Sequence, residues 1–151
     1  MTVRARFAHT NLISHDWKAL ARFYEQVFGC TPEPPERNLS GPWLDAATGL
    51  PGARLRGIHL RLPGHGDQGP TLEIFQYDEM EPRPETAVNR PGLGHLAFAV
   101  DDVEAALEAL LAAGGGIIGE ITTVQISGMS TITFVYATDP EGNVIELQHW
   151  A

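Results

Sequence analysis

The chain has 151 residues, of which 43% are hydrophobic, and a formal net charge of −9. This length allows one well-buried domain or two small modules that share a sheet, and the composition is that of a folded protein rather than a disordered one. The acidic balance argues against nucleic acid as a partner, because phosphate backbones are bound by clustered Lys and Arg. No apolar run of about eighteen residues and no apolar signal core is present, so we expect a cytoplasmic protein that does not bind membranes.

The first half of the chain predicts a strand, a helix and a hairpin. Residues 6–13 have strand composition, and from Trp17 to Phe28 apolar residues recur at helical spacing before Gly29 supplies a stop. The prolines between 31 and 53 predict an irregular segment with at most a turn of helix near 44–48. Two alternating strands, 54–62 and 71–77, are expected to form the hairpin.

The second half repeats this plan after a linker at 79–91, which is rich in proline and charged residues. We expect a strand at 94–100, and a helix at 102–113 that begins with the capping-box pair Asp101 and Glu104. Three further strands are expected near 117–126, 131–137 and 143–149. The two modules, about 5–78 and 92–151, are each expected to have a strand and a helix followed by two or three antiparallel strands. They therefore predict an α+β fold whose helices cover one face of each sheet.

The two modules are copies of one pattern. Four landmarks coincide when the copies are superimposed in sequence: His9 with His95, Asp16 with Asp102, Ala19 with Ala105, and Gly29 with Gly115. Each copy is followed by a strand that carries one Glu between apolar neighbours, TLEIFQY around Glu73 and NVIELQHW around Glu146. Self-similarity of this kind indicates internal duplication, so each module offers one His and one Glu.

Alternation along a strand shows which neighbours share a face with these residues. His95 shares its face with Ala97 and Ala99, so it is expected to point to the open side of the sheet, away from the helix. Taken singly, a strand His is more often a core residue and a strand Glu more often solvated. Two imidazoles and two carboxylates in matched positions instead predict a mixed nitrogen and oxygen site, which suits Zn, Ni, Fe, Co or Mn better than Ca or Mg.

The remaining polar and aromatic residues receive weaker assignments. Side chains on the same faces as the predicted ligands are candidates for substrate binding: Asn11, Phe75, Tyr77 and Gln148. The other histidines, His15, His65 and His149, are expected to be surface or supporting residues, and His59 is unassigned. Cys30 is expected to be a packing residue. Arg54, Arg56 and Arg61 could hold an anion, although charges on an edge strand are more often simply solvated.

These residues resemble a known family. The order His9, Glu73, His95 and Glu146, with FYEQVFG after the first strand and TDPEGNVIEL before the last Glu, is similar to the vicinal oxygen chelate superfamily. That superfamily includes glyoxalase I, methylmalonyl-CoA epimerase, extradiol dioxygenases, and fosfomycin and bleomycin resistance proteins. The resemblance spans about residues 6–150 and implies one α+β domain of two tandem βαβββ modules, forming a cup-shaped mixed sheet around a metal with helices on the convex side.

The resemblance also implies the ligands of one divalent transition metal per site, namely His9, Glu73, His95 and Glu146. This set is nearest to bacterial glyoxalase I and to methylmalonyl-CoA epimerase-like members, and in glyoxalase I the last Glu also acts as a base. The sequence departs from the glyoxalase I pattern at Ser14, Leu20 and Cys30, which speaks against glutathione substrates. In this superfamily the two modules of one site come from one chain or from two, and we expect a homodimer.

We therefore expect a metal-dependent lyase or isomerase of glyoxalase or epimerase type, in which Glu146 removes a proton next to a metal-chelated carbonyl. Its partner would be a small molecule with vicinal oxygens or an acidic C–H beside a carbonyl. One alternative is an Fe(II) extradiol-type dioxygenase. Such enzymes bind iron with two His and one carboxylate, and Glu73 would be a fourth ligand that crowds this triad. Oxygen consumption with a catechol would reveal this activity. Another is a metal-free drug-binding module with an apolar pocket of Trp43, Phe75, Tyr77 and Trp150, whose ligand binding a chelator would leave unchanged.

Overall fold

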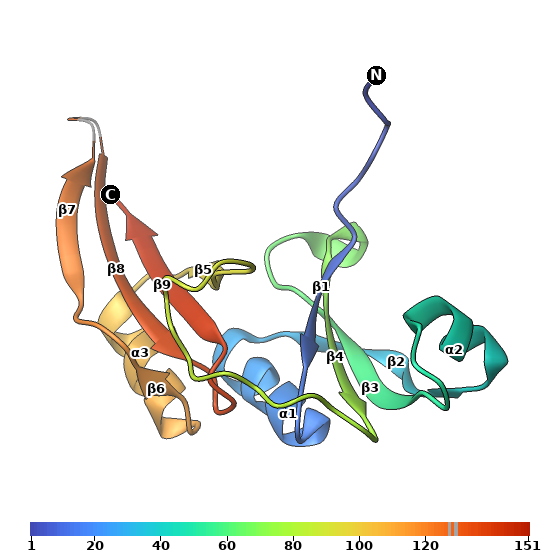
Figure 1. The fold of residues 1–151 in the computed structure, drawn as a ribbon. Helices are drawn as coiled ribbons and strands as arrows, with labels where there is room; N and C mark the ends of the chain where they lie inside the picture. The colour runs from blue at the N-terminus through green and yellow to red at the C-terminus, as the bar shows by residue number, and fades with distance from the viewer. Residues whose placement is uncertain (127, 129) are drawn as a thin grey trace. The chain divides into compact units, whose positions relative to one another are not determined.

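The computed structural model describes residues 1–126, 128 and 130–151. These residues form two compact units, Met1–Pro82 (unit 1) and Arg83–Ala151 (unit 2), each built of one mixed sheet with a helix against it (Figure 1). The predicted α+β class is confirmed. The boundary between the units lies inside the predicted linker 79–91. That the two modules make one cup-shaped domain stays a prediction.

Unit 1 holds a four-stranded sheet in the order β1-β4-β3-β2. Its elements are β1 (His9–Ile13), α1 (Trp17–Phe28), β2 (Thr31–Ser40), α2 (Pro42–Thr48), β3 (Arg54–Arg61), the short 3-10 turn η1 (Gly66–Gln68) and β4 (Thr71–Tyr77). β1 runs parallel to β4, whereas β3 and β4 form the predicted antiparallel hairpin.

Helix α1 has the bounds that its periodicity predicts. The Asp16 carboxylate accepts a hydrogen bond from Ala19 N at 3.0 Å, and Gly29 ends the helix in the left-handed region at φ 67°. The buried face of α1, which includes Leu20 and Tyr24, packs on β3 and β4, whose inward residues such as Leu60, Leu72 and Ile74 have no exposed surface. This packing leaves the opposite face of β4 to carry Glu73.

The prediction that residues 31–53 are irregular was wrong. Strand β2 contains Pro32, Pro34 and Pro35, yet it pairs with β3 along most of its length. It can do so because β2 lies at the edge of the sheet, where a missing N–H is tolerated, and because its register is interrupted between Glu33 and Arg37, where two of the prolines stand. The turn of helix expected near 44–48 is present as α2.

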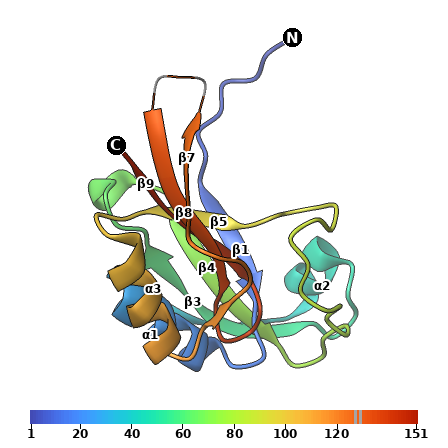
Figure 2. The ribbon, with the colours of Figure 1, turned by 90° about the vertical axis from the view of Figure 1, so that its left-hand side faces the viewer.

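Unit 2 repeats the plan with a sheet in the order β5-β9-β8-β6, and β7 also pairs with β8. Its elements are β5 (Leu96–Ala99), α3 (Val103–Ala112), β6 (Gly116–Ile117), β7 (Thr122–Ile126), β8 (Ser130–Thr138) and β9 (Val144–Trp150). The strand expected at 117–126 is therefore two short strands. Figure 2 shows α3 beside β8 and β9, onto which it packs Leu107 and Leu110.

The capping residue of α3 differs from the prediction. Asp102, not Asp101, is the N-cap, and its carboxylate accepts from Ala105 N at 3.0 Å, as Asp16 does from Ala19 N in unit 1. The matched caps show that the duplication extends to the hydrogen bonds that begin each helix.

The β8–β9 turn of unit 2 is organised by Asp139, which is buried. Its Oδ1 accepts from the backbone N of Glu141 at 2.9 Å and of Asn143 at 3.0 Å. Two residues of the predicted linker bond the same turn, Arg83 to the Asn143 side chain at 3.0 Å and Thr86 to the Gly142 carbonyl at 2.8 Å. This part of the linker is therefore packed onto unit 2. No helix among the described residues is long and apolar enough to cross a membrane.

Candidate metal centre

Unit 1 brings His9 and Glu73 together on one face of its sheet. Parallel pairing of β1 and β4 sets Asn11 beside Glu73, and His9, two residues earlier, shares that face. His9 Nε2 lies 2.9 Å from Glu73 Oε1, and the Asn11 side-chain amide donates to the same oxygen at 3.3 Å. The Glu73 side chain is only 11% exposed, whereas that of His9 is 43% exposed, so the imidazole is the more solvent-accessible member of this pair.

His59, which the sequence left unassigned, is a third partner of Glu73. It stands opposite Glu73 in the antiparallel β3–β4 pair, and its Nε2 lies 2.7 Å from Glu73 Oε2. Burial lowers the pKa of His59 below its ordinary value; the Glu73 charge opposes this shift, and Arg37 and His9 reinforce it.

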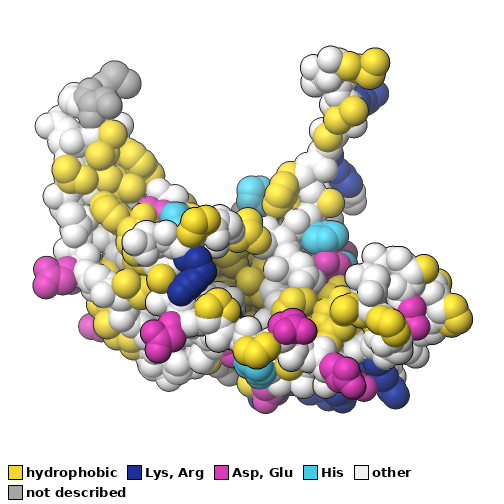
Figure 3. Space-filling model, viewed as in Figure 1, with side chains coloured by type: hydrophobic (Ala, Val, Ile, Leu, Met, Phe, Trp, Pro, Cys, Tyr) yellow, Lys and Arg dark blue, Asp and Glu magenta, His cyan; other side chains and the backbone are white. Residues whose placement is uncertain are grey.

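Unit 2 contains the matching pair. His95 Nε2 lies 2.9 Å from Glu146 Oε2, with side-chain exposures of 36% and 13%. Glu146 is flanked in the sheet by Ala97 of β5 and Tyr136 of β8, and the Tyr136 ring lies 5.2 Å from the His95 ring. His95, Ala97 and Ala99 are exposed and their alternate neighbours are less so, as the alternation predicts. Figure 3 shows histidine side chains open at the surface.

Each pair has donor atoms spaced as two ligands of one ion would be. At metal–ligand distances of about 2.0–2.1 Å, two donors at a right angle are about 2.9 Å apart. No three of the His, Cys, Asp and Glu side chains that the structure describes form a group able to hold a metal ion. The reason in unit 1 is that His9 and His59 approach opposite oxygens of one carboxylate, so they share no common point. Each unit therefore brings together one pair of candidate ligands, called here a half-site.

The candidate substrate residues differ in how free they are. Asn11 is bonded to Glu73, and the Gln148 side chain accepts from Trp150 Nε1 at 2.6 Å. Phe75 and Tyr77 are partly buried and pack against a small cluster that contains Leu44, Ala53 and Leu55. The two aromatic residues thus lie on the same face of β4 as Glu73, where they pack against this cluster.

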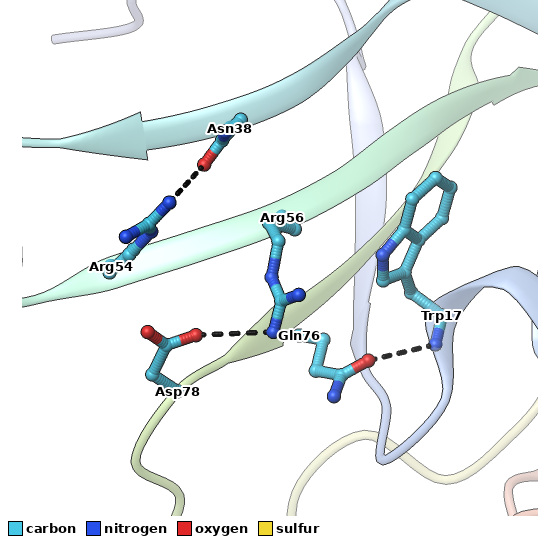
Figure 4. A network of polar contacts seen from close by, with 6 residues as sticks. All are labelled: Trp17, Asn38, Arg54, Arg56, Gln76 and Asp78. Atoms are coloured by element: carbon cyan, nitrogen blue, oxygen red, sulfur yellow. Dashed lines mark hydrogen bonds and ion pairs between the residues drawn. The ribbon is translucent and has the colours of Figure 1, made fainter.

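Of the three arginines of β3, Arg54 and Arg56 lie on the face opposite to Glu73. Arg54 and Arg56 alternate with Leu55 and Gly57, and they lie on the helix side of the sheet, the side on which Gln76 accepts from the backbone N of Trp17 at 3.3 Å (Figure 4). Arg56 pairs with Asp78 at 3.2 Å, and Arg54 donates to Asn38 at 3.4 Å. Arg61 alternates onto the face of Glu73 but pairs with Asp67 at 2.9 Å.

The departures from the glyoxalase I pattern are interior residues. Ser14, Leu20 and Cys30 are between 0% and 4% exposed, so they bear on packing beneath the sheet rather than on contact with a substrate. Burial raises the pKa of the Cys30 thiol to about 11. His149, predicted to support rather than bind, has its Nδ1 2.9 Å from the carbonyl of Val100 at the end of β5.

Comparison with known proteins identifies the family. A model of the Glyoxalase/Bleomycin resistance protein/Dioxygenase superfamily matches residues 6–147, and the protein belongs to this superfamily. A probable lactoylglutathione lyase from Vibrio parahaemolyticus is 30% identical over 145 residues, which cover 94% of this chain and 88% of that protein.

Solved structures agree on the fold. A glyoxalase family protein from Bacillus cereus superimposes with a TM-score of 0.81 at 20% identity, over 99% of this chain and 96% of that one. A glyoxalase I variant from Zea mays has a TM-score of 0.64 at 22% identity, over 95% of this chain and 44% of the maize chain. At these identities the likeness is one of fold; the match to the superfamily model over residues 6–147 is what confirms the resemblance drawn from the sequence.

Proposed function

We propose that this protein is a divalent-metal-dependent lyase or isomerase of glyoxalase type, which moves a proton next to the carbonyl of a small substrate. The observation that carries the proposal is the matched pair of half-sites, each with an imidazole Nε2 2.9 Å from a carboxylate oxygen. Membership of the superfamily and the likeness to a probable lactoylglutathione lyase support the same reaction class.

The donor set fits a transition metal. His9, Glu73, His95 and Glu146 are the proposed ligands, and two imidazoles with two carboxylates suit one Zn, Ni, Co, Fe or Mn ion. When bound, such an ion polarises a substrate carbonyl and stabilises the negative charge that develops on its oxygen. His9 and His95 are the more exposed members of their pairs, so each imidazole can turn its Nε2 from the carboxylate to an incoming ion.

Glu146 is the proposed catalytic base. Its carboxylate takes a proton from the carbon next to the carbonyl and returns it to the same or the adjacent carbon, so the proton count of the enzyme is unchanged over one turnover. Within the described part of the chain, the side-chain partner of Glu146 is His95, whereas Glu73 has three. A carboxylate with fewer partners is freer to move between ligand and base.

The substrate is proposed to be a small molecule with vicinal oxygens or an acidic C–H beside a carbonyl. Phe75 and Tyr77 offer apolar contact near Glu73, while Asn11 and Gln148 offer amides on the ligand-bearing faces. The expected homodimer and cytoplasmic location stay predictions.

Metal analysis of protein purified without a metal-binding tag tests the proposal first. We expect one divalent transition ion per site, lost with activity on treatment with a chelator and regained with added metal. Turnover would then be surveyed with 2-oxoaldehyde hemithioacetals, α-hydroxy carbonyls and acyl-CoA thioesters. Oxygen uptake with a catechol would replace the proposal with a dioxygenase, and chelator-insensitive binding of an apolar drug to metal-free protein would replace it with a sequestering module.

A further inference from the structure

Glu73 has a separate partner for each of its carboxylate oxygens. His9 and Asn11 contact Oε1, at 2.9 and 3.3 Å, and His59 contacts Oε2 at 2.7 Å. Because an ionised carboxylate only accepts hydrogen bonds, the His59 Nε2 must act as the donor in this contact. Among the contacts of Glu73, the one to His59 is the shortest.

The fold holds the His59 ring in place. Its position directly opposite Glu73 in the β3–β4 pair puts both side chains on one face, close enough to interact. The ring lies between those of Phe75 and His9, at centroid distances of 5.9 and 6.1 Å. The His59 side chain is 19% exposed and that of His9 is 43% exposed. His59 is therefore the more buried of the two histidines that contact Glu73, and His9 is the more accessible to solvent.

We infer that His59 is a positioning residue for Glu73: by holding Oε2 it leaves Oε1, the oxygen beside His9 Nε2, as the ligand atom. This inference rests on the proposed role of Glu73 as a metal ligand. Carboxylates that bind metals are themselves oriented by hydrogen bonds, and loss of such a partner typically weakens metal binding by about 10- to 100-fold. In unit 2 the residue opposite Glu146 is Tyr136 rather than a histidine, so the proposed positioning by a histidine applies to unit 1.

The test compares two substitutions of His59 with one of an exposed histidine. His59→Phe keeps a ring without a donor, His59→Gln keeps a donor, and His65→Gln alters a histidine in the exposed β3–β4 loop. The affinity of each full-length, metal-free protein for Zn²⁺ and Co²⁺ is measured by competition with a chelating indicator. We expect His59→Phe to bind about 10- to 100-fold more weakly, His59→Gln to recover most of that loss, and His65→Gln to match the wild type.

The possible results separate this inference from the proposed function. Wild-type protein that binds no divalent ion overturns both, whereas wild-type binding with an undiminished affinity in His59→Phe overturns only the role of His59. Loss of one nitrogen donor from the Co²⁺ shell in His59→Gln, seen by X-ray absorption, would make His59 a ligand and also overturns the inference.

A second measurement covers the case in which His59→Phe does not fold. Nitrogen-15 spectra of metal-free wild-type protein report which ring nitrogen of His59 carries the proton. We expect the Nε2–H tautomer, with that proton shifted downfield by its bond to Glu73. An Nδ1–H tautomer would overturn the inference without use of a variant.

Discussion

Glu73 and Glu146 occupy the same place in the two modules, yet their surroundings differ. Each lies on a strand that pairs in parallel with a second strand, β1, which begins at His9, or β5, which begins directly after His95. The two glutamates are similarly buried, with side chains 11% and 13% exposed. The Glu73 carboxylate contacts the side chains of His9, Asn11 and His59. The Glu146 carboxylate contacts His95, and its neighbours on the adjacent strands are Ala97 and Tyr136. The difference teaches that the two modules share the His–Glu pair but not the neighbours that hold the glutamate, which suits the proposal of one fixed and one mobile carboxylate.

The largest expected effect separates the two carboxylates directly. Glu146→Gln should bind metal yet lose about 10²- to 10⁴-fold in kcat, because the proposed base is removed. Glu73→Gln should instead lose metal affinity, because a proposed ligand is removed. Steady-state kinetics at saturating metal, together with competition titration of each variant, measure both. Full turnover in Glu146→Gln would remove its role as base, and equal behaviour of the two variants would remove the comparison.

Two glycines offer the next largest effect. A Cβ at Gly57 would meet the Ile74 carbonyl oxygen and lie 2.6 Å from the Phe75 ring, and one at Gly115 would meet the Leu110 side chain and lie 2.5 Å from the Thr138 carbonyl oxygen. Each change to Ala should lower the free energy of unfolding by about 2–3 kcal/mol through overpacking.

The two glycine variants should differ in metal binding. Phe75 contacts the His59 ring, so Gly57→Ala should also weaken metal affinity, whereas Gly115→Ala should not. Chemical denaturation and metal titration of both variants provide the check. Unchanged metal affinity in Gly57→Ala would show that the support of Glu73 does not extend to Phe75.

Loss of the N-cap residue should destabilise the two modules by similar amounts, because the caps of α1 and α3 are alike and lie outside the proposed site. Asp16→Ala and Asp102→Ala each remove a 3.0 Å hydrogen bond to the first turn, and each should cost about 1 kcal/mol of stability. Denaturation midpoints at constant slope would measure this, with kcat as the control. Clearly unequal losses would mean that the two helices contribute differently to their units.

The smallest effect is expected at Cys30, which aligns with Gly116 of the second copy. With its pKa raised to about 11, the native thiol should hold about 100-fold less thiolate at pH 7 than an unperturbed one. A thiol reagent should therefore react slowly with native protein and rapidly after denaturation. Cys30→Ala should leave kcat unchanged, and rapid native labelling with loss of activity would contradict the packing role.

Much of the fold could be predicted because its signals are local. The spacing of apolar residues from Trp17 to Phe28, with Asp16 before it and Gly29 after it, determined both ends of α1. The N-cap of α3 was assigned to Asp101 from a local motif, although the superposition of Asp102 on Asp16 pointed to the correct residue. Strand β2 was missed because the proline rule applies to central strands, and its place at the sheet edge is a tertiary fact.

The sequence predicted the two His–Glu pairs of the candidate site but not the residue that holds Glu73 in place. Duplication pointed to His9 and Glu73, and to His95 and Glu146, and the structure brings each pair within contact. His59 was missed because its role depends on the register of the β3–β4 hairpin, and a one-residue slip would place it on the other face. The long loop between these strands leaves that register open; pairing them about Gly66, near its centre, would have set His59 opposite Glu73.

The prolines of β2 have a consequence for how copies of the protein can associate. An edge strand normally presents a row of free N–H groups on which another chain can template a new strand. Pro32, Pro34 and Pro35 have no N–H to offer, and the break in register between Glu33 and Arg37 interrupts the row further. The β2 edge of the sheet is thus a poor template for strand addition from another copy of the chain.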